Sequence, residues 1–186
     1  MAKTVYLIGF RGVGWRDPRY RNEGELIKAG HIGIRFPDDN EIYGFHPTDK
    51  AVADAGGEAA IGKLLKAHVP QEGQLFRDDA IFERAYVLSQ SGARTHVWEA
   101  PIMLDDEEYE RIKALIQRWQ SDGKIWMYSF PPDDVEEMPD TLDNCATFPR
   151  RLGLPIPEVT GNLRSYLPEL QKMDQARQWK PEGDED

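Results

Sequence analysis

Residues 29–46 carry the pattern of a β-hairpin, which constrains the fold more than any other stretch of this 186-residue chain. Two apolar-rich runs, Ala29–Phe36 and Glu41–His46, are separated by Pro37-Asp38-Asp39-Asn40, whose residue types favour a tight turn. With residues 37–40 as the loop, Phe36 faces Glu41, and counting outward from the turn places His31 opposite His46. The pattern therefore predicts an antiparallel pair of strands with two histidines on one face.

The predicted register gives the two faces of the hairpin different characters. Directly opposite residues share a face, with Cβ atoms about 4.5–5.5 Å apart, so the rings of His31 and His46 are expected to touch. The same face carries Gly33 opposite Gly44, and glycine inside a strand often marks a close approach by another part of the chain. The other face is apolar and is expected to pack in the core: Ile32, Ile34, Tyr43 and Phe45. Another element should therefore lie against the histidine face.

Cys145 is the single cysteine, so no intramolecular disulfide can form. It is expected in the first turn of a short helix spanning Asp143–Leu152, packed on the glycine-paired histidine face. The positive end of a helix dipole and a neighbouring imidazolium both favour thiolate, and Cys–His pairing makes a thiol nucleophilic at neutral pH. We therefore predict Cys145 as nucleophile, His31 as base and His46 as the residue that orients the His31 ring.

Other interpretations of these residues stay open. A lone cysteine is most often a buried, small apolar residue. Two histidines and a cysteine could instead bind Zn²⁺, although we expect neither a metal nor a cofactor in the site. A one-residue slip of the hairpin would flip every side chain, and Glu41 would then replace His46 as the orienting residue.

The remaining elements predict one α+β domain over residues 1–174, an antiparallel sheet with packed helices. A helical segment is expected at 48–68, with Thr48 as N-cap and a break at Gly56-Gly57. The polar, acidic residues 175–186 are predicted to be disordered. The other predicted strands are Lys3–Phe10, Ala80–Leu88, Thr95–Leu104 and Lys124–Phe130; the other predicted helices are Glu107–Gln120, capped by Asp105, and Asn162–Asp174.

A glycine-rich segment follows the first predicted strand. Gly9 and Gly14 have the spacing of a phosphate-binding loop, but Trp15 and Arg16 stand where that loop needs Lys and Ser or Thr. Nucleotide binding is therefore not expected. The glycines would instead let backbone approach a substrate, with Arg11 binding a carboxylate and Trp15 forming a cleft wall; Asn144 is a third expected substrate-binding residue.

Charge and hydropathy exclude two classes of partner. The net charge of −10 repels nucleic-acid backbones, and no cluster of Lys and Arg is interleaved with aromatic residues. No run approaches eighteen consecutive apolar residues, so a membrane-spanning helix is not expected. The first residues lack the features of a cleaved signal peptide, which favours a protein that is cytoplasmic when made, and export without such a signal stays open.

Two short motifs carry a resemblance to a known family. Gly30-His31-Ile32-Gly33-Ile34 on an early strand, with Asn144-Cys145-x-x-Phe148 opening a late helix, resembles the circularly permuted papain-like hydrolases, which include permuted NlpC-type peptidases and the lecithin:retinol acyltransferase family. The resemblance implies that Cys145 is the nucleophile, His31 the base and His46 the orienting residue. Two departures are a long gap between the motifs, which implies an insertion at 48–68, and Pro149, which could kink the helix.

The resemblance also implies a function. It favours a cysteine amidase or endopeptidase that forms an acyl-thioester, with a bacterial cell-wall peptide as substrate. Such an enzyme could act as an exported toxin effector with an immunity or secretion partner protein, or in wall recycling inside the cell. The alternatives are an acyltransferase or thioesterase acting on lipid-like substrates and a catalytically silent peptide-binding domain.

Overall fold

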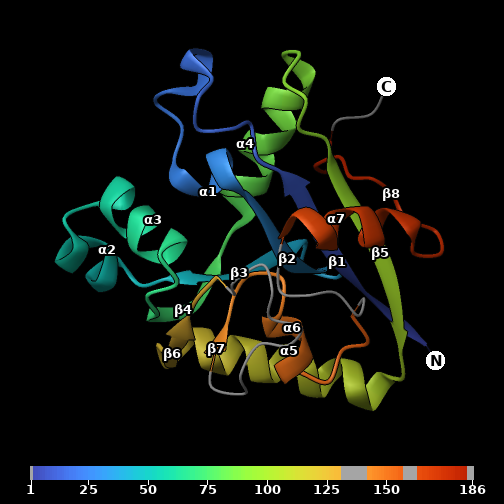
Figure 1. Cartoon of the computed structure of the whole chain (residues 1–186). Helices are drawn as coiled ribbons and strands as arrows, with labels where there is room; N and C mark the ends of the chain where they lie inside the picture. Colours follow the sequence, from blue (N-terminus) through green and yellow to red (C-terminus); the bar gives the residue numbers. More distant parts are fainter. Residues whose placement is uncertain (1, 131–141, 157–162, 184–186) are drawn as a thin grey trace.

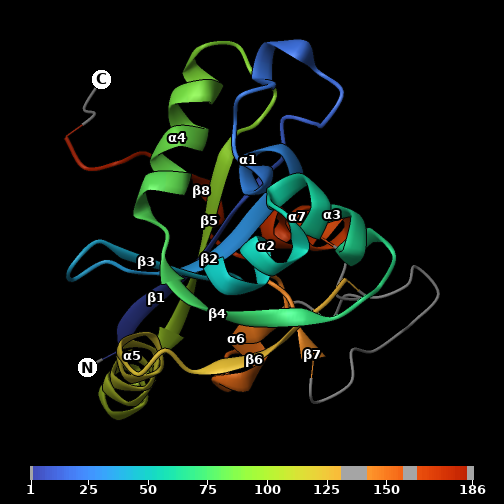
Figure 2. The same ribbon diagram turned by 90° about the vertical axis from the view of Figure 1, so that its left-hand side faces the viewer.

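The computed structural model describes residues 2–130, 142–156 and 163–183, which form a mixed α+β fold around one curled sheet. The strand order is β7-β6-β4-β3-β2-β1-β5-β8, and all neighbours are antiparallel except β6 and β7. Figure 2 shows the sheet turning, so that β4 runs across the direction of β5. The strands are β1 (Lys3–Arg11), β2 (Gly30–Phe36), β3 (Glu41–Pro47), β4 (Gln71–Arg77), β5 (Val97–Leu104), β6 (Ile125–Tyr128), β7 (Leu142–Asp143) and β8 (Arg177–Gln178).

Helices cover both faces of the sheet and divide the core into two clusters (Figure 1). The larger cluster includes residues of α2, α3, α5, α6 and α7, and the smaller one includes residues of α1 and α4. Because both faces are covered, all seven residues of β2 are buried. The helices are α1 (Glu25–Ala29), α2 (Asp49–Ala55), α3 (Glu58–Lys66), α4 (Asp79–Gln90), α5 (Asp106–Ser121), α6 (Phe148–Arg151) and α7 (Leu163–Lys172), with a 3₁₀ turn η1 (Pro18–Tyr20).

The predicted hairpin and its register are confirmed. Strands β2 and β3 pair with Gly33 opposite Gly44 and Phe36 opposite Glu41. The two expected faces are present as well. Ile32, Ile34, Tyr43 and Phe45 lie in the larger core cluster, whereas Ile42 lies in the smaller cluster on the other face.

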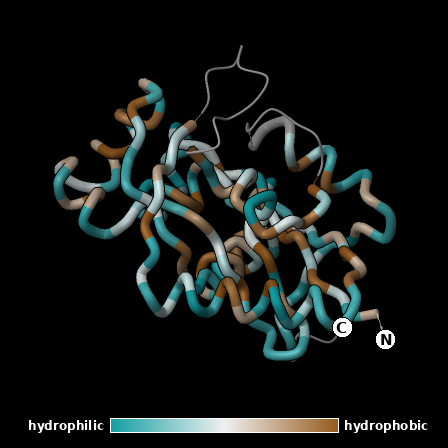
Figure 3. Tube along the Cα trace, turned by 90° about the horizontal axis from the view of Figure 1, so that it is seen from below, coloured by the Kyte–Doolittle hydropathy of each residue, from teal (hydrophilic) through white to brown (hydrophobic). Residues whose placement is uncertain are grey.

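Two helical predictions are also confirmed by their capping. The Thr48 hydroxyl accepts a hydrogen bond from the Ala51 N–H at 3.0 Å, and the helical segment breaks at Gly56 and Gly57, where φ is 94° and 110°. The Asp105 carboxylate accepts from the Glu108 N–H at 2.7 Å at the start of α5. Figure 3 shows the hydrophilic segments on the peripheral loops. Within the described residues, no helix has the length and apolar character to cross a membrane.

The segment 71–90 differs from the prediction. Residues 80–88 belong to helix α4 instead of a strand, and the strand of this region is β4, immediately before it. The buried residues of α4 recur at helical spacing: Phe82, Ala85, Tyr86 and Leu88. Strand β4 was missed because Leu75 and Phe76 are its only two apolar side chains, so the strand carries little hydrophobic pattern.

The predicted disorder of residues 175–186 is wrong for 175–183, whereas 184–186 lie outside the described residues. Strand β8 pairs with the edge of β5, and Arg177 forms an ion pair with the buried Glu99 at 2.8 Å. The Trp179 ring is buried and packs edge-on against Tyr86 at 6.2 Å between centroids. A large aromatic ring within a charged segment was the signal that this segment returns to the core.

Candidate active site

His31, near the start of β2, forms the centre of a buried cluster of ionisable groups. Its Nε2 lies 2.7 Å from Oδ2 of Asp78, and both side chains are almost completely buried. Asp78 stands between β4 and α4, where its backbone N–H donates to the Ile42 carbonyl at 2.9 Å. That hydrogen bond fixes the carboxylate over strand β3.

The glycine pair of the hairpin makes room for this carboxylate. A Cβ atom at Gly44 would overlap Oδ2 of Asp78 and Nε2 of His31, and one at Gly33 would lie 3.2 Å from Cε2 of Phe82. The prediction that another element lies against the histidine face is therefore confirmed. The identity of that element was wrong, because Asp78 and Phe82 of the β4–α4 segment cover the glycines, and the Cys145 segment does not.

His46 occupies the expected neighbourhood but makes a different contact. Its ring centroid lies 5.8 Å from that of His31, and its Nε2 lies 3.1 Å from Oδ1 of Asp78. The predicted direct orientation of His31 by His46 is thus wrong, because the Asp78 carboxylate stands between the two rings and binds both. The alternative residue, Glu41, accepts from the Tyr43 hydroxyl at 2.7 Å and pairs with Arg77.

Cys145 lies in a turn before helix α6. The N–H groups of Thr147 and Phe148 donate to the Asn144 carbonyl at 3.2 and 3.1 Å, and α6 begins only at Phe148. The prediction that Cys145 lies in the first turn of a helix is therefore wrong, and a four-residue helix supplies little dipole. Pro149 stands in the first turn of α6, where no N–H is needed, so it does not kink the helix.

Asn144 holds this turn with its side chain. Its Oδ1 accepts from the Ala146 N–H at 2.8 Å and the Thr147 N–H at 3.2 Å, and the residue is 2 % exposed. The Thr147 hydroxyl donates to Asp143 at 3.0 Å on the other side of the turn. Asn144 therefore positions the Cys145 backbone, and its predicted contact with a substrate stays a prediction.

The electrostatics of the cluster join Cys145 to His31. Burial alone would lower the pKa of His31, but its hydrogen bond with Asp78 and, after it, the effect of Cys145 outweigh burial and raise that pKa to about 10. Burial opposes ionisation of Asp78, yet hydrogen bonds from His31 and His46 lower the pKa of Asp78 to about 2. Asp78 takes Nε2, and the buried Nδ1 of His31 has no hydrogen-bond partner among the described residues.

The pKa values of two buried tyrosines depend on Cys145, and no sequence pattern singled out either residue. Burial and then the charge of Cys145 raise the pKa of Tyr128, on β6, well above its usual value. The same two causes raise the pKa of Tyr166, on α7. The two tyrosines come from elements on either side of Cys145 in the chain, so only the tertiary structure brings them together.

The glycine-rich segment approaches the start of β2. A Cβ atom at Gly12 would overlap the backbone of Lys28, Ala29 and Gly30, so this glycine allows backbone contact within the protein. Arg11 is exposed at the end of β1 and lies opposite Gly30, the residue before His31. The register pairs Phe10 with His31 and puts Arg11 on the opposite face of the sheet, so the predicted substrate contact of Arg11 stays a prediction.

Trp15 lies further along the same segment, on the surface. Its side chain is 41 % exposed, and the Lys66 ammonium of α3 lies 4.2 Å from the ring. A Cβ atom at Gly62 of α3 would lie 3.7 Å from the ring. Trp15 is therefore a surface residue against α3, and no contact joins it to the cluster around His31 among the described residues.

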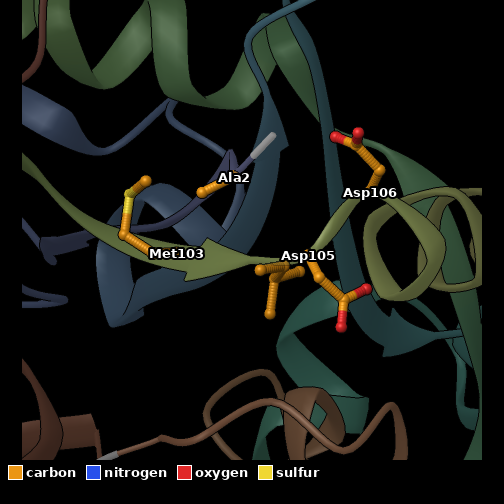
Figure 4. Close-up of a pocket in the computed structure, with 5 residues that line it drawn as sticks. Ala2, Met103, Asp105 and Asp106 are labelled. Atoms are coloured by element: carbon orange, nitrogen blue, oxygen red, sulfur yellow. The ribbon is translucent and has the colours of Figure 1, made fainter.

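The described part of the chain carries no cluster of metal ligands, and two hollows lie on it that Cys145 and His31 do not line. No group of three His, Cys, Asp or Glu side chains there could hold a metal ion. One hollow of about 400 Å³ is lined by Ala2, Met103, Leu104, Asp105 and Asp106 (Figure 4). A second, of about 480 Å³, is lined by residues that include Tyr6, Arg35 and Arg177. Neither hollow is lined by Cys145 or His31.

We predict that His46 stabilises the cluster by holding Asp78. Its ring stacks on Phe76 at 4.0 Å, and its Nε2 donates to an ionised carboxylate. Replacing His46 by leucine should lower the free energy of unfolding by about 2 kcal/mol, the usual contribution of a hydrogen bond to a charged group. His46→Gln, which keeps an N–H donor, should lose less. Urea denaturation measures both, and equal losses would contradict a role through the Asp78 contact.

The comparisons with known proteins add no assignment to this geometry. No protein-family model matches the chain, and neither a curated protein nor a solved structure matches it.

Proposed function

We propose that the protein is a cysteine hydrolase in which Cys145 is the nucleophile, His31 the base and Asp78 the residue that orients His31. One observation carries the proposal: the buried His31 ring binds the Asp78 carboxylate through Nε2 and keeps a buried Nδ1 that has no hydrogen-bond partner among the described residues. A buried Cys, His and carboxylate in this order is the arrangement that activates a thiol for acyl transfer. The proposed fold is that of the permuted papain-like hydrolases, with the histidine strand before the cysteine segment.

The geometry divides the chemistry among three side chains. The thiol proton passes to Nδ1 of His31 before the attack, in keeping with the raised pKa of that ring, and Cys145 Sγ then bonds to the carbonyl carbon of the substrate. Asp78 accepts from the Nε2–H, which fixes the ring and stabilises the imidazolium. The imidazolium then gives its proton to the leaving nitrogen as the C–N bond breaks, and water hydrolyses the remaining acyl-thioester.

The proposed substrate is an amide bond in a bacterial cell-wall peptide. This part rests on the resemblance of the Gly30–Ile34 and Asn144–Phe148 motifs to the permuted NlpC-type peptidases. We further propose that the protein is an exported effector that acts with an immunity or secretion partner protein. A thioesterase or acyltransferase would use the same three residues, and the products distinguish these activities.

The first test uses the single cysteine of the chain. We expect iodoacetamide to alkylate Cys145 rapidly at neutral pH, with or without a chelator, because His31 accepts the thiol proton. His31→Ala should slow alkylation at least tenfold, by loss of about 1.4 kcal/mol or more of transition-state stabilisation. Intact-mass spectrometry gives both rates. A thiol that is inert in the folded wild type, or that reacts only after chelation, would contradict the proposal.

The second test identifies the bond. Cell-wall stem peptides incubated with the wild type should gain one water and split at an amide, which mass spectrometry detects. Cys145→Ala is the control. Transfer of an acyl group to a second molecule, or cleavage of thioesters without amides, would favour the acyltransferase or thioesterase alternative.

A further inference from the structure

The second hollow of the structure lies away from the candidate active site. Strands β1, β2, β5 and β8 supply four of the residues that line it, which are Tyr6, Arg35, Glu99 and Arg177. Arg35 follows His31 by four residues on the same face of β2, so the two side chains leave the strand about 13 Å apart. The hollow is therefore a separate place in the fold, and the proposed reaction does not use it.

Two arginines share one carboxylate in the wall of this hollow. Nε and Nη2 of Arg35 donate to Oε2 of Glu99 at 2.9 and 2.6 Å. Nε of Arg177 donates to Oε1 of Glu99 at 2.9 Å, and its Nη2 lies 2.8 Å from the same oxygen. The side chains of Arg35 and Glu99 are both buried. Because two guanidinium groups surround a single carboxylate, the cluster keeps an excess of one positive charge.

The two guanidinium groups keep donors that Glu99 does not use. An arginine side chain has more N–H groups than the two nitrogens that face Glu99 in each case. One further contact of Arg35 is the hydrogen bond from its Nη1 to Oδ1 of Asn40, which is long at 3.4 Å. Each oxygen of Glu99 already faces two guanidinium nitrogens, so this carboxylate has no free position for the remaining donors. Those donors are available to an acceptor in the hollow.

The Tyr6 ring holds the two arginines in place. Its centroid lies 4.5 Å from Cζ of Arg35 and 5.5 Å from Cζ of Arg177, so one ring contacts both cations. Groups that are already fixed lose little conformational entropy when a ligand binds them. The hollow has a volume of about 480 Å³, which is enough for a small molecule.

We propose that this hollow binds a small oxyanion, a molecule with a carboxylate or phosphate group, through Arg35 and Arg177. Guanidinium groups recognise carboxylate and phosphate in the same way, by paired N–H donors on two oxygens. The chain carries a net charge of −10, so its overall field repels anions and the local excess of positive charge must supply the attraction. One arginine would suffice to neutralise Glu99 and fasten β8 to β5, and the second arginine carries the inference.

The experiment follows the melting temperature as sodium phosphate or, separately, sodium acetate is added, with sodium chloride keeping the ionic strength constant. We expect at least one of the two anions to raise it in the wild type along a saturable curve, with the millimolar Kd of so small a ligand. Arg177→Gln removes the excess charge while Arg35 still neutralises Glu99, so the Kd should rise about tenfold or more. The Arg177 side chain is 62 % exposed, so this variant should fold.

A surface arginine provides the matched control. The Arg19 side chain is 69 % exposed, pairs with Asp17 through Nε and Nη2, and lies over the Tyr20 ring, so it repeats the contacts of Arg177 with a carboxylate of its own. Arg19→Gln should leave the Kd within about twofold of the wild type, because it removes the same charge outside the hollow.

A second variant tests the sign of the effect. Glu99→Gln raises the excess charge of the cluster, so phosphate or acetate should bind more tightly. The variant also leaves the buried Arg35 without its counter-charge and should be less stable than the wild type. The bound anion should therefore restore more stability to Glu99→Gln than it adds to the wild type, whereas chloride should not.

The outcomes are distinct from those that test the cysteine hydrolase, because no step involves Cys145. A response to phosphate alone, to acetate alone or to both supports the site and identifies the acidic group of its ligand. A wild type without a saturable response up to about 50 mM of either anion overturns the inference. An unchanged Kd in Arg177→Gln, or an equal rise in Arg19→Gln, also overturns it. If the anion restores no stability to Glu99→Gln, the cluster only fastens β8 to β5, and the inference is wrong.

Discussion

Replacing Cys145 by alanine is expected to abolish peptide hydrolysis while the protein stays folded. The substitution removes the only atom that can form the acyl-thioester, so activity should fall by a factor of about 10⁴ or more, to the background of the assay. Only one sulfur is lost from the core, which should cost about 1 kcal/mol of unfolding free energy. Turnover of a cell-wall peptide and the midpoint of urea unfolding measure the two effects.

This pair of measurements separates a nucleophile from a structural cysteine. Cys145 is 4 % exposed and packs in the main core cluster, as an inert cysteine also would. A purely structural role predicts a loss of stability with unchanged turnover. Cys145→Ser serves as the control for volume, because it keeps a polar atom near His31 but replaces the thiol by a poorer nucleophile. Hydrolysis that persists in Cys145→Ala would end the proposal that Cys145 is the nucleophile.

The hairpin and its two faces could be predicted because local rules determine them. A four-residue turn and the strict alternation of side chains set the register, so Gly33 was correctly paired with Gly44. Because glycine has no side chain, another part of the chain was correctly expected to pack against this pair. The spacing of side chains along a strand carries this information without reference to the rest of the chain.

The partner of His31 could not be predicted in the same way. Asp78 reaches His31 across strands β3 and β4, and the prediction of a strand at 80–88 hid the helix that begins beside this carboxylate. In the sequence alone, an aspartate next to another acidic residue at the start of a helix is most simply explained as a helix-capping residue. Only the pairing of β3 with β4 shows that it fills the space above Gly44.

The setting of Cys145 was partly predictable. Its neighbours Asn144 and Thr147 are turn-forming residues, and the turn they build delays the helix to Phe148. The expected proximity of Cys145 to His31 came from a resemblance in motif order, whereas the effect of Cys145 on Tyr128 and Tyr166 depends on how β6 and α7 pack. Those packing contacts leave no local pattern in the sequence.

The second large effect is expected for Asp78→Asn, which removes the charge that His31 and His46 share. The substitution leaves a buried imidazolium without its counter-charge, so the free energy of unfolding should fall by about 3–5 kcal/mol. Asp79→Asn is the matched control. Asp79 is the next residue and pairs with the partly exposed Arg77 at 2.9 Å, and its loss should cost about 1 kcal/mol or less.

The loss of stability in Asp78→Asn should depend on pH, because the pKa values of His31 and Asp78 are both shifted in the folded protein. The pKa of His31 is raised to about 10 in the folded protein. The contribution of the protonated ring to the free energy of unfolding is therefore complete below the pKa of about 6.5 in the unfolded chain and is lost as pH rises toward 10. The pKa of Asp78 is lowered to about 2. The contribution of the ionised carboxylate to the free energy of unfolding is therefore complete above the unfolded pKa of about 3.8 and is lost as pH falls toward 2. The difference in unfolding free energy between wild type and Asp78→Asn should therefore be largest between about pH 4 and 6.5 and should narrow on both sides. Urea unfolding of both proteins from pH 3 to 10 measures this difference, and a constant difference across that range would show that Asp78 and His31 do not form an ion pair.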